Sequence, residues 1–198
     1  MKKILFIICL IPLLSFSQVG INNNVYHVGD SAWTDITVPA TTIRQGASTK
    51  PDFNTDSLTL DFPQNNESEI AYLNVQFGHD WLTGSDISPH IHYLQNEAGS
   101  PDFIIEYRWL SNGNAVTDWT TDTTYMSVFP YTSGSIMQIL EFPKIDGSAI
   151  TGVSSMLQIK LYRRTGDGVS GDVQVLEFDI HIQIDSNGSD SEYLKSWD

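Results

Sequence analysis

The chain has 198 residues, with 24 acidic side chains against 10 basic ones and a formal net charge of −14. Hydrophobic residues make up 40% of it and aromatic residues 11%, which is enough to build a core and excludes wholesale disorder. The length fits one domain. The excess of acidic residues disfavours nucleic acid and anionic membrane surfaces as partners.

The N-terminus has the pattern of a secretory signal peptide. A basic start is followed by an apolar run at residues 4–14, which is shorter than a membrane span, and then by small residues. We expect residues 1–17 to be removed, with cleavage near Ser17 or Gln18, and residues 18–198 to form a single β-sandwich domain. The expected location is therefore secreted or periplasmic.

The only cysteine, Cys9, lies within the predicted signal peptide. The mature chain is therefore expected to lack thiols, which excludes disulfides, thiolate metal sites and cysteine nucleophiles. No other stretch is apolar and long enough to predict a membrane span.

The rest of the chain alternates apolar and polar residues in short runs separated by turn residues, which is typical of β-strands. The predicted strands are residues 25–29, 32–38, 57–62, 69–78, 87–95, 102–110, 123–131, 135–142, 153–164 and 173–185. A helical period is absent apart from one turn near 191–195. About ten strands without alternating helices predict an all-β fold, an antiparallel β-sandwich or jelly roll. Residues 41–55 are expected to form a long loop over it.

Alternation along a strand also assigns side chains to faces. In the last predicted strand the expected core face consists of Leu176, Phe178, Ile180, Ile182 and Ile184, and the polar stripe consists of Glu177, Asp179, His181 and Gln183. In strand 87–95, His90 and His92 face away from the apolar side. Three interpretations of these polar faces stay open: a solvated face with ion pairs, a face buried against another subunit, and a ligand or metal site.

The most specific local pattern is His90-Ile91-His92. Two histidines at i and i+2 on a strand project to one side, so their imidazoles can share a metal ion. His181 is a candidate third nitrogen ligand, and Asp179 or Glu177 a candidate carboxylate ligand. Such a set suits Zn, Fe(II), Mn or Ni.

Gly84, the His-x-His pair and Glu97 reproduce the spacing of the first cupin motif, so this short segment resembles the cupin family. The resemblance implies a metal-binding jelly-roll enzyme with His90, His92, Glu97 and His181 as its ligands. The glycine that closes the motif is absent, and so is the second motif ahead of His181.

Two further kinds of site are considered. Three tryptophans, Trp81, Trp119 and Trp197, are candidates for a sugar-stacking platform, although such residues also plug the ends of sandwiches. Carboxylates near Asp167 and Asp172 are candidates for Ca²⁺. No nucleophile elbow or phosphate-binding glycine loop is present in the sequence.

A wider resemblance covers most of the mature chain, from about Trp33 to Glu192. It rests on residues 33–39, 50–53, 89–92, 154–157, 161–163 and 177–181, and then on Asp185, Gly188 and Ser189. In these segments the chain resembles a group of uncharacterised proteins encoded by tailed bacteriophages and prophages. The resemblance implies a β-rich, oligomeric, virion-associated protein without established enzymatic activity. The signal peptide departs from that pattern, because virion proteins assemble in the cytoplasm.

The sequence as a whole predicts an exported, non-enzymatic β-sandwich that acts in binding or assembly. Its expected partners are further copies of itself, as a homo-oligomer, and a cell-surface or polymeric ligand. A metal-binding cupin-like enzyme and a carbohydrate-binding module are the alternatives. The acidity of the chain makes a divalent metal ion, Ca²⁺ or a transition metal, the expected small partner.

Overall fold

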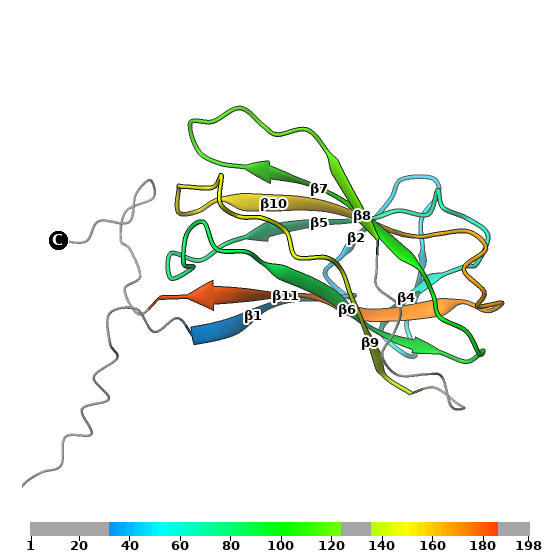
Figure 1. Ribbon diagram of the computed structural model, residues 1–198. Helices are drawn as coiled ribbons and strands as arrows, with labels where there is room; N and C mark the ends of the chain where they lie inside the picture. The colour runs from blue at the N-terminus through cyan, green and yellow to red at the C-terminus, as the bar shows by residue number, and fades with distance from the viewer. Residues whose placement is uncertain (1–31, 124–135, 186–198) are drawn as a thin grey trace, which may run out of the picture.

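The structure, a computed structural model (Figure 1), describes residues 32–123 and 136–185. These ranges contain eleven strands and no helix that could span a membrane. The strands are β1 (Ala32–Pro39), β2 (Arg44–Gln45), β3 (Asp52–Asn54), β4 (Thr59–Phe62), β5 (Ala71–Gln76), β6 (Ser88–Gln95), β7 (Phe103–Leu110), β8 (Thr120–Thr123), β9 (Gln138–Glu141), β10 (Met156–Arg163) and β11 (Val173–Ile184). The predicted signal peptide, the strand at 25–29 and the turn at 191–195 lie outside the described residues.

Two antiparallel sheets form the two layers of the molecule (Figure 1). Sheet A has the order β3-β4-β11-β6-β9, with β1 also paired to β11, and sheet B has the order β2-β5-β10-β7-β8. Pairing is nested: β7 with β8, β6 with β9, β5 with β10, and β4 with β11. That is a long hairpin rolled into two sheets, so the predicted antiparallel sandwich or jelly roll is confirmed.

The hydrophobic core lies between the sheets, and alternation fills it as expected. In β5, Ala71, Leu73 and Val75 are buried, whereas the residues between them are exposed. One end of the core is aromatic: Trp81 is fully buried and stacks on Trp109 with ring centroids 5.9 Å apart. Trp81 is therefore a core residue and not part of an exposed platform.

Strand β11 contains an irregularity that the simple alternation missed. Its pairing with β6 shifts register between Val175 and Glu177, so Leu176 is an extra residue in a β-bulge. Because of this bulge, Val173 and Val175 are buried together with Phe178, although their sequence parity differs. The expected core position of Leu176 is wrong: this residue is only partly buried.

Two other expectations need correction. Residues 41–55, predicted as a loop, contain the short strands β2 and β3, which pair with β5 and β4. They are too short for periodicity to reveal. The strand predicted at 123–131 shares only Thr123 with β8, Thr120–Thr123, and its remaining residues, 124–131, lie outside the described ranges.

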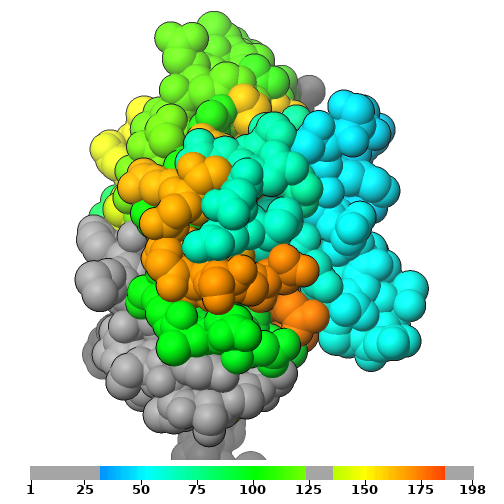
Figure 2. Space-filling model, turned by 90° about the vertical axis from the view of Figure 1, so that its right-hand side faces the viewer, coloured from blue at the N-terminus to red at the C-terminus, as the bar shows by residue number. Residues whose placement is uncertain are grey.

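A buried ion pair joins the end of β10 to the connection between β10 and β11. This connection is orange in Figure 2, which views the sandwich from one end. The side chains of Arg163 and Asp167 are fully buried, with Nε to Oδ2 at 2.7 Å and Nη2 to Oδ1 at 2.8 Å. Arg163 also donates to the carbonyls of Phe62, Gly171 and Val169. This pair was not expected from the sequence, because alternation alone places an arginine on the core side without naming its partner.

Candidate functional site

Three side chains converge on the outer face of sheet A and form what is called here the histidine cluster: His90, His92 and Asp179. The register of β6 against β11 sets His90 opposite Asp179, and His92 opposite Glu177. The apolar residues between them, including Ile91, point into the core and fix both strands. Three of the four residues predicted as metal ligands, His90, His92 and Asp179, thus lie together in the structure, and that they bind a metal stays a prediction.

The potential ligand atoms of the cluster are close together. His90 Nε2 lies 3.1 Å from His92 Nε2, and Asp179 Oδ2 lies 3.4 Å from His92 Nε2 and 3.8 Å from His90 Nε2. Of the described His, Cys, Asp and Glu residues, only these three form a group whose ligand atoms all lie within 4.8 Å of one another.

The cluster is buried, although it lies on an outer sheet face. His90 and Asp179 are each only 6% exposed. Burial, together with the neighbouring His181 and His92 rings, lowers the pKa of His90, so the neutral imidazole is favoured. Burial raises the pKa of Asp179, and His92 and a hydrogen bond from Thr37 act in the opposite direction.

Two buried polar atoms of the cluster have no hydrogen-bond partner in the part of the chain that the structure describes. They are His92 Nδ1 and Asp179 Oδ1. The former lies 3.6 Å from Glu177 Oε1, beyond hydrogen-bond distance. Buried polar atoms are rarely left this way in native proteins, so the cluster is a place where a further ligand is expected.

The other predicted ligands lie elsewhere. His181 is beside His90, with ring centroids 4.6 Å apart, but its Nε2 is directed to Asp35 Oδ1 at 3.2 Å and its side chain is 48% exposed. Glu97 follows the end of β6 and lies near Gly171, so the structure does not assemble the ligand set that the cupin resemblance implies.

The calcium candidates do not converge either. Both oxygens of Asp167 accept hydrogen bonds from Arg163, and Asp172 belongs to no group of potential metal ligands found in the described ranges.

A cavity of about 590 Å³ opens beside the histidine cluster. Its walls include His90, His92 and His181, together with Ile139, Glu141 and Lys144. Solvent or a small ligand can therefore reach the cluster from outside the sheet.

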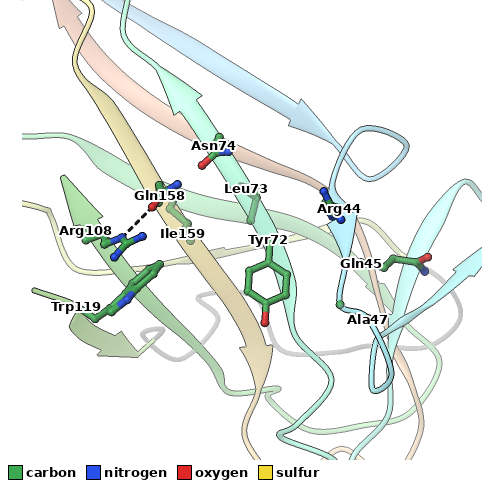
Figure 3. A pocket seen from close by; sticks show the side chains of 11 residues that line it. Arg44, Gln45, Ala47, Tyr72, Leu73, Asn74, Arg108, Trp119, Gln158 and Ile159 are labelled. Carbon is green, nitrogen blue, oxygen red and sulfur yellow. Dashed lines mark hydrogen bonds between the residues drawn. The ribbon is translucent and has the colours of Figure 1, made fainter. Parts of the chain in front are cut away.

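A second hollow, called here the sheet B groove, lies on the outer face of the other sheet and also measures about 590 Å³. Figure 3 shows Arg44 on one side of it and Arg108 with Trp119 on the other, with Tyr72 between them. Asn74 and Gln158 come from the neighbouring strands β5 and β10, where they are paired in register.

The side chains of the groove hold one another in place. Arg108 Nε donates to Gln158 Oε1 at 2.8 Å, and the Arg108 guanidinium and Lys160 ammonium lie 4.5 and 4.0 Å from the centre of the Trp119 ring. Trp119 is 36% exposed and Tyr72 is 39% exposed. Of the three tryptophans considered from the sequence, Trp119 alone is seen at such a surface, since Trp81 is buried and Trp197 lies outside the described residues.

No family model matches the chain, and no curated protein matches it. Solved structures show distant likenesses. The CBM36-1 domain of a multidomain xylanase from the hindgut metagenome of Trinervitermes trinervoides is 11% identical, with a TM-score of 0.42, over 74% of this chain and 96% of that one. Arthrobacter globiformis T6 isomalto-dextranase is 13% identical, with a TM-score of 0.41, over 74% of this chain and 23% of that one.

A chain in the structure of infectious bursal disease virus Gx strain is 13% identical, with a TM-score of 0.37, over 83% of this chain and 36% of that one. Likenesses at this level carry no argument about ligand or activity, and the jelly-roll assignment rests on the strand pairing of the chain itself. Of the expected resemblance to phage proteins, the β-rich architecture is present, and membership in that group stays a prediction.

Proposed function

We propose that the chain is an exported, non-enzymatic binding protein whose sheet B groove holds a polysaccharide or a similar polyhydroxylated polymer. One observation carries the proposal: two half-exposed aromatic rings, Tyr72 and Trp119, line one open groove together with amide and guanidinium groups.

The chemistry of the groove suits a sugar chain. A pyranose ring has an apolar face of C–H groups, which packs on an aromatic ring, and a rim of hydroxyl groups that both donate and accept hydrogen bonds. The amides of Asn74 and Gln158 also donate and accept, and Arg108 carries further N–H donors. An open groove on a rigid sheet accepts an extended chain without first closing around it.

The charge of the groove favours an acidic polymer. Two of the seven Lys and Arg side chains in the described ranges line this groove, Arg44 and Arg108, whereas the nearby Lys160 is paired with Glu106 at 2.6 Å. The whole chain is strongly acidic, so this concentration is local. We expect carboxylated or sulfated polysaccharides to bind more tightly than neutral ones, and this preference to weaken as salt screens the charges.

Affinity electrophoresis in gels that contain neutral or acidic polysaccharides tests the proposal. Trp119→Ala and Tyr72→Ala should each weaken retention about fivefold, because an aromatic stacking contact contributes about 1 kcal/mol. Trp33→Ala is the matched control, since Trp33 is 52% exposed but lies on sheet A. The proposal fails if no polysaccharide retards the chain, or if the control loses as much retention as the two groove variants.

Export is part of the proposal and has its own test. The basic and apolar start of the chain supports it. When the full chain is expressed in a bacterium, the protein recovered from the periplasm or medium should begin close to Gln18 by N-terminal sequencing. An intact Met1 on protein that stays in the cytoplasm would contradict export.

Assembly is a second candidate function, and one observation favours it. Strand β9 pairs only with β6 among the described strands, and Ile136, Met137 and Ile139 at this edge are 47%, 55% and 38% exposed. Neighbouring exposed apolar side chains are typical of interaction surfaces. Light scattering coupled to size-exclusion chromatography should give an oligomer that Ile136→Asp dissociates and Val116→Asp does not. A monomeric mass for the unmutated chain would refute assembly.

A further inference from the structure

The donor atoms of the histidine cluster are spaced like the corners of a metal site. Three atoms separated by 3.1, 3.4 and 3.8 Å lie on a circle with a radius of about 2.0 Å, and metal–nitrogen and metal–oxygen bonds to Zn²⁺ are about 2.0–2.2 Å long. One ion can therefore contact His90 Nε2, His92 Nε2 and Asp179 Oδ2 together, with little movement of any side chain.

The surroundings of the two histidines fit this role. A neutral imidazole carries a lone pair on one ring nitrogen, and Nε2 is the nitrogen of His90 that faces His92 and Asp179. On the other histidine, Nδ1 has no hydrogen-bond partner among the described residues, and the Glu177 carboxylate lies 3.6 Å away, so a small shift would let Nδ1 donate to Glu177 as metal-bound histidines commonly do to a carboxylate. Asp179 supplies a negative charge to the ion.

We propose that His90, His92 and Asp179 bind one first-row divalent transition-metal ion of the Zn²⁺ class, with a coordination position open to the adjacent cavity. Two nitrogen donors and one oxygen donor suit such an ion. Ca²⁺ and Mg²⁺ prefer sites built of oxygen atoms, so the imidazoles select against them.

The open position follows from the shape of the site. The cavity beside the cluster is lined by His90 and His92, so it reaches the ligands themselves. His181 and Glu141 stand in its wall, and His181 is held by Asp35 instead of completing the donor set. A water molecule or a small anionic ligand would complete the coordination of the ion. The cluster lies on sheet A and the groove on sheet B, so this proposal does not depend on the proposed function.

Calorimetric titration with ZnCl₂ of the full chain, purified without a histidine tag and freed of metal with a chelator, provides the main test. One ion should bind per chain, and Co²⁺ in its place should give visible absorption bands. His92→Gln and Asp179→Asn should each weaken binding by at least about tenfold. Ca²⁺ should not compete with Zn²⁺.

Two matched variants separate this site from unspecific histidine binding. His79→Gln removes a histidine that is outside the cluster and hydrogen-bonds to Ser154, and it should leave binding unchanged. His181→Gln should keep the stoichiometry of one and lose less affinity than His92→Gln. An equal loss in both would contradict the three-donor set.

A measurement without substitutions covers the case in which a variant does not fold. In nitrogen NMR spectra of the unmutated chain, Zn²⁺ should shift the ring signals of two histidines strongly and leave the others near their positions. The proposal is overturned if no saturable transition-metal binding occurs, or if folded His92→Gln binds Zn²⁺ like the unmutated chain.

Discussion

The buried Arg163–Asp167 pair allows a quantitative prediction about stability. Arg163→Met keeps an unbranched apolar stem but removes the guanidinium, which makes five hydrogen bonds to Asp167 and to three backbone carbonyls. Asp167 would then be a buried carboxylate that accepts hydrogen bonds only from the backbone amides of Asp102 and Val169, as far as the described residues show.

The expected cost is large because the pair is fully buried. Breaking a buried ion pair by removing one partner costs about 3–5 kcal/mol, since the remaining charge stays in the interior without compensation. A domain of this size loses about 2–4 °C of Tm for each kcal/mol, so Arg163→Met should lower Tm by about 6–20 °C.

Urea unfolding followed by circular dichroism measures this effect, and the next residue supplies the control. Arg164 pairs with Asp102 at 2.9 Å, but its side chain is 45% exposed. Exposed pairs contribute about 0–1 kcal/mol, so Arg164→Met should change the free energy of unfolding little. If the two variants lose stability equally, the argument from burial is refuted.

The pH dependence of the same pair has a definite sign. Burial alone would raise the pKa of Asp167, but hydrogen bonds from Arg163 and from the amides of Val169 and Asp102 hold it below the ordinary value of 3.8. A lowered carboxyl pKa stabilises the fold above that ordinary value, and the stabilisation is lost as the pH falls through the lower, folded-state pKa. In Arg163→Met the hydrogen bonds from the guanidinium are gone and burial dominates, so the pKa of Asp167 should be raised. The difference in free energy of unfolding between the unmutated chain and the variant should therefore become smaller as the pH falls from 7 to 4. A difference that grows over this range would contradict the reasoning.

Three further predictions concern other parts of the fold. Trp81→Ala should lower the free energy of unfolding by about 3–5 kcal/mol, as measured in urea, because Trp81 is fully buried. Lys160 hydrogen-bonds to Glu106 and lowers its pKa, so Lys160→Met should raise the pKa of Glu106 in an NMR titration of side-chain carboxyls, and an unchanged value would exclude the pairing in solution. Gly147→Ala should destabilise the fold by about 1–3 kcal/mol in thermal unfolding, because its Cβ would clash with the carbonyl of Ser85.

Period-2 alternation was enough to predict the layers of the molecule. It placed the long strands β6, β7, β10 and β11 with errors of a few residues. It also assigned His90 and His92 to the face of β6 that points away from the core. It works there because one face of each strand meets the core and the other does not. Strands of two or three residues, such as β2 and β3, carry too few positions for a period to appear.

The parts that could not be predicted depend on contacts between distant segments. The sequence offered Asp179 and Glu177 as alternative carboxylate ligands, and the pairing of β11 with β6 is what sets Asp179 opposite His90. That His181 is held by Asp35 follows from the pairing of β11 with β1. Likewise, an arginine at position 163 is tolerated in the interior because Asp167 folds back onto it. A single sequence gives the face of a side chain, whereas its partner depends on register.

The extra residue at Leu176 has a consequence for how this protein can change. Upstream of it β11 is flanked by β4 and β6, and downstream by β1 and β6. The register of each half is therefore set by its own neighbouring strands, and the bulge accommodates the one extra residue between the two halves. Loss of Leu176 would make Val175 and Glu177 neighbours opposite Tyr93 and His92, so alternation along β11 would become regular, with Val173 still in the core and Asp179 still outside it. A single-residue deletion in β11 should accordingly be tolerated at the bulge, whereas a deletion elsewhere in the strand would turn the residues on one side of it to the opposite face.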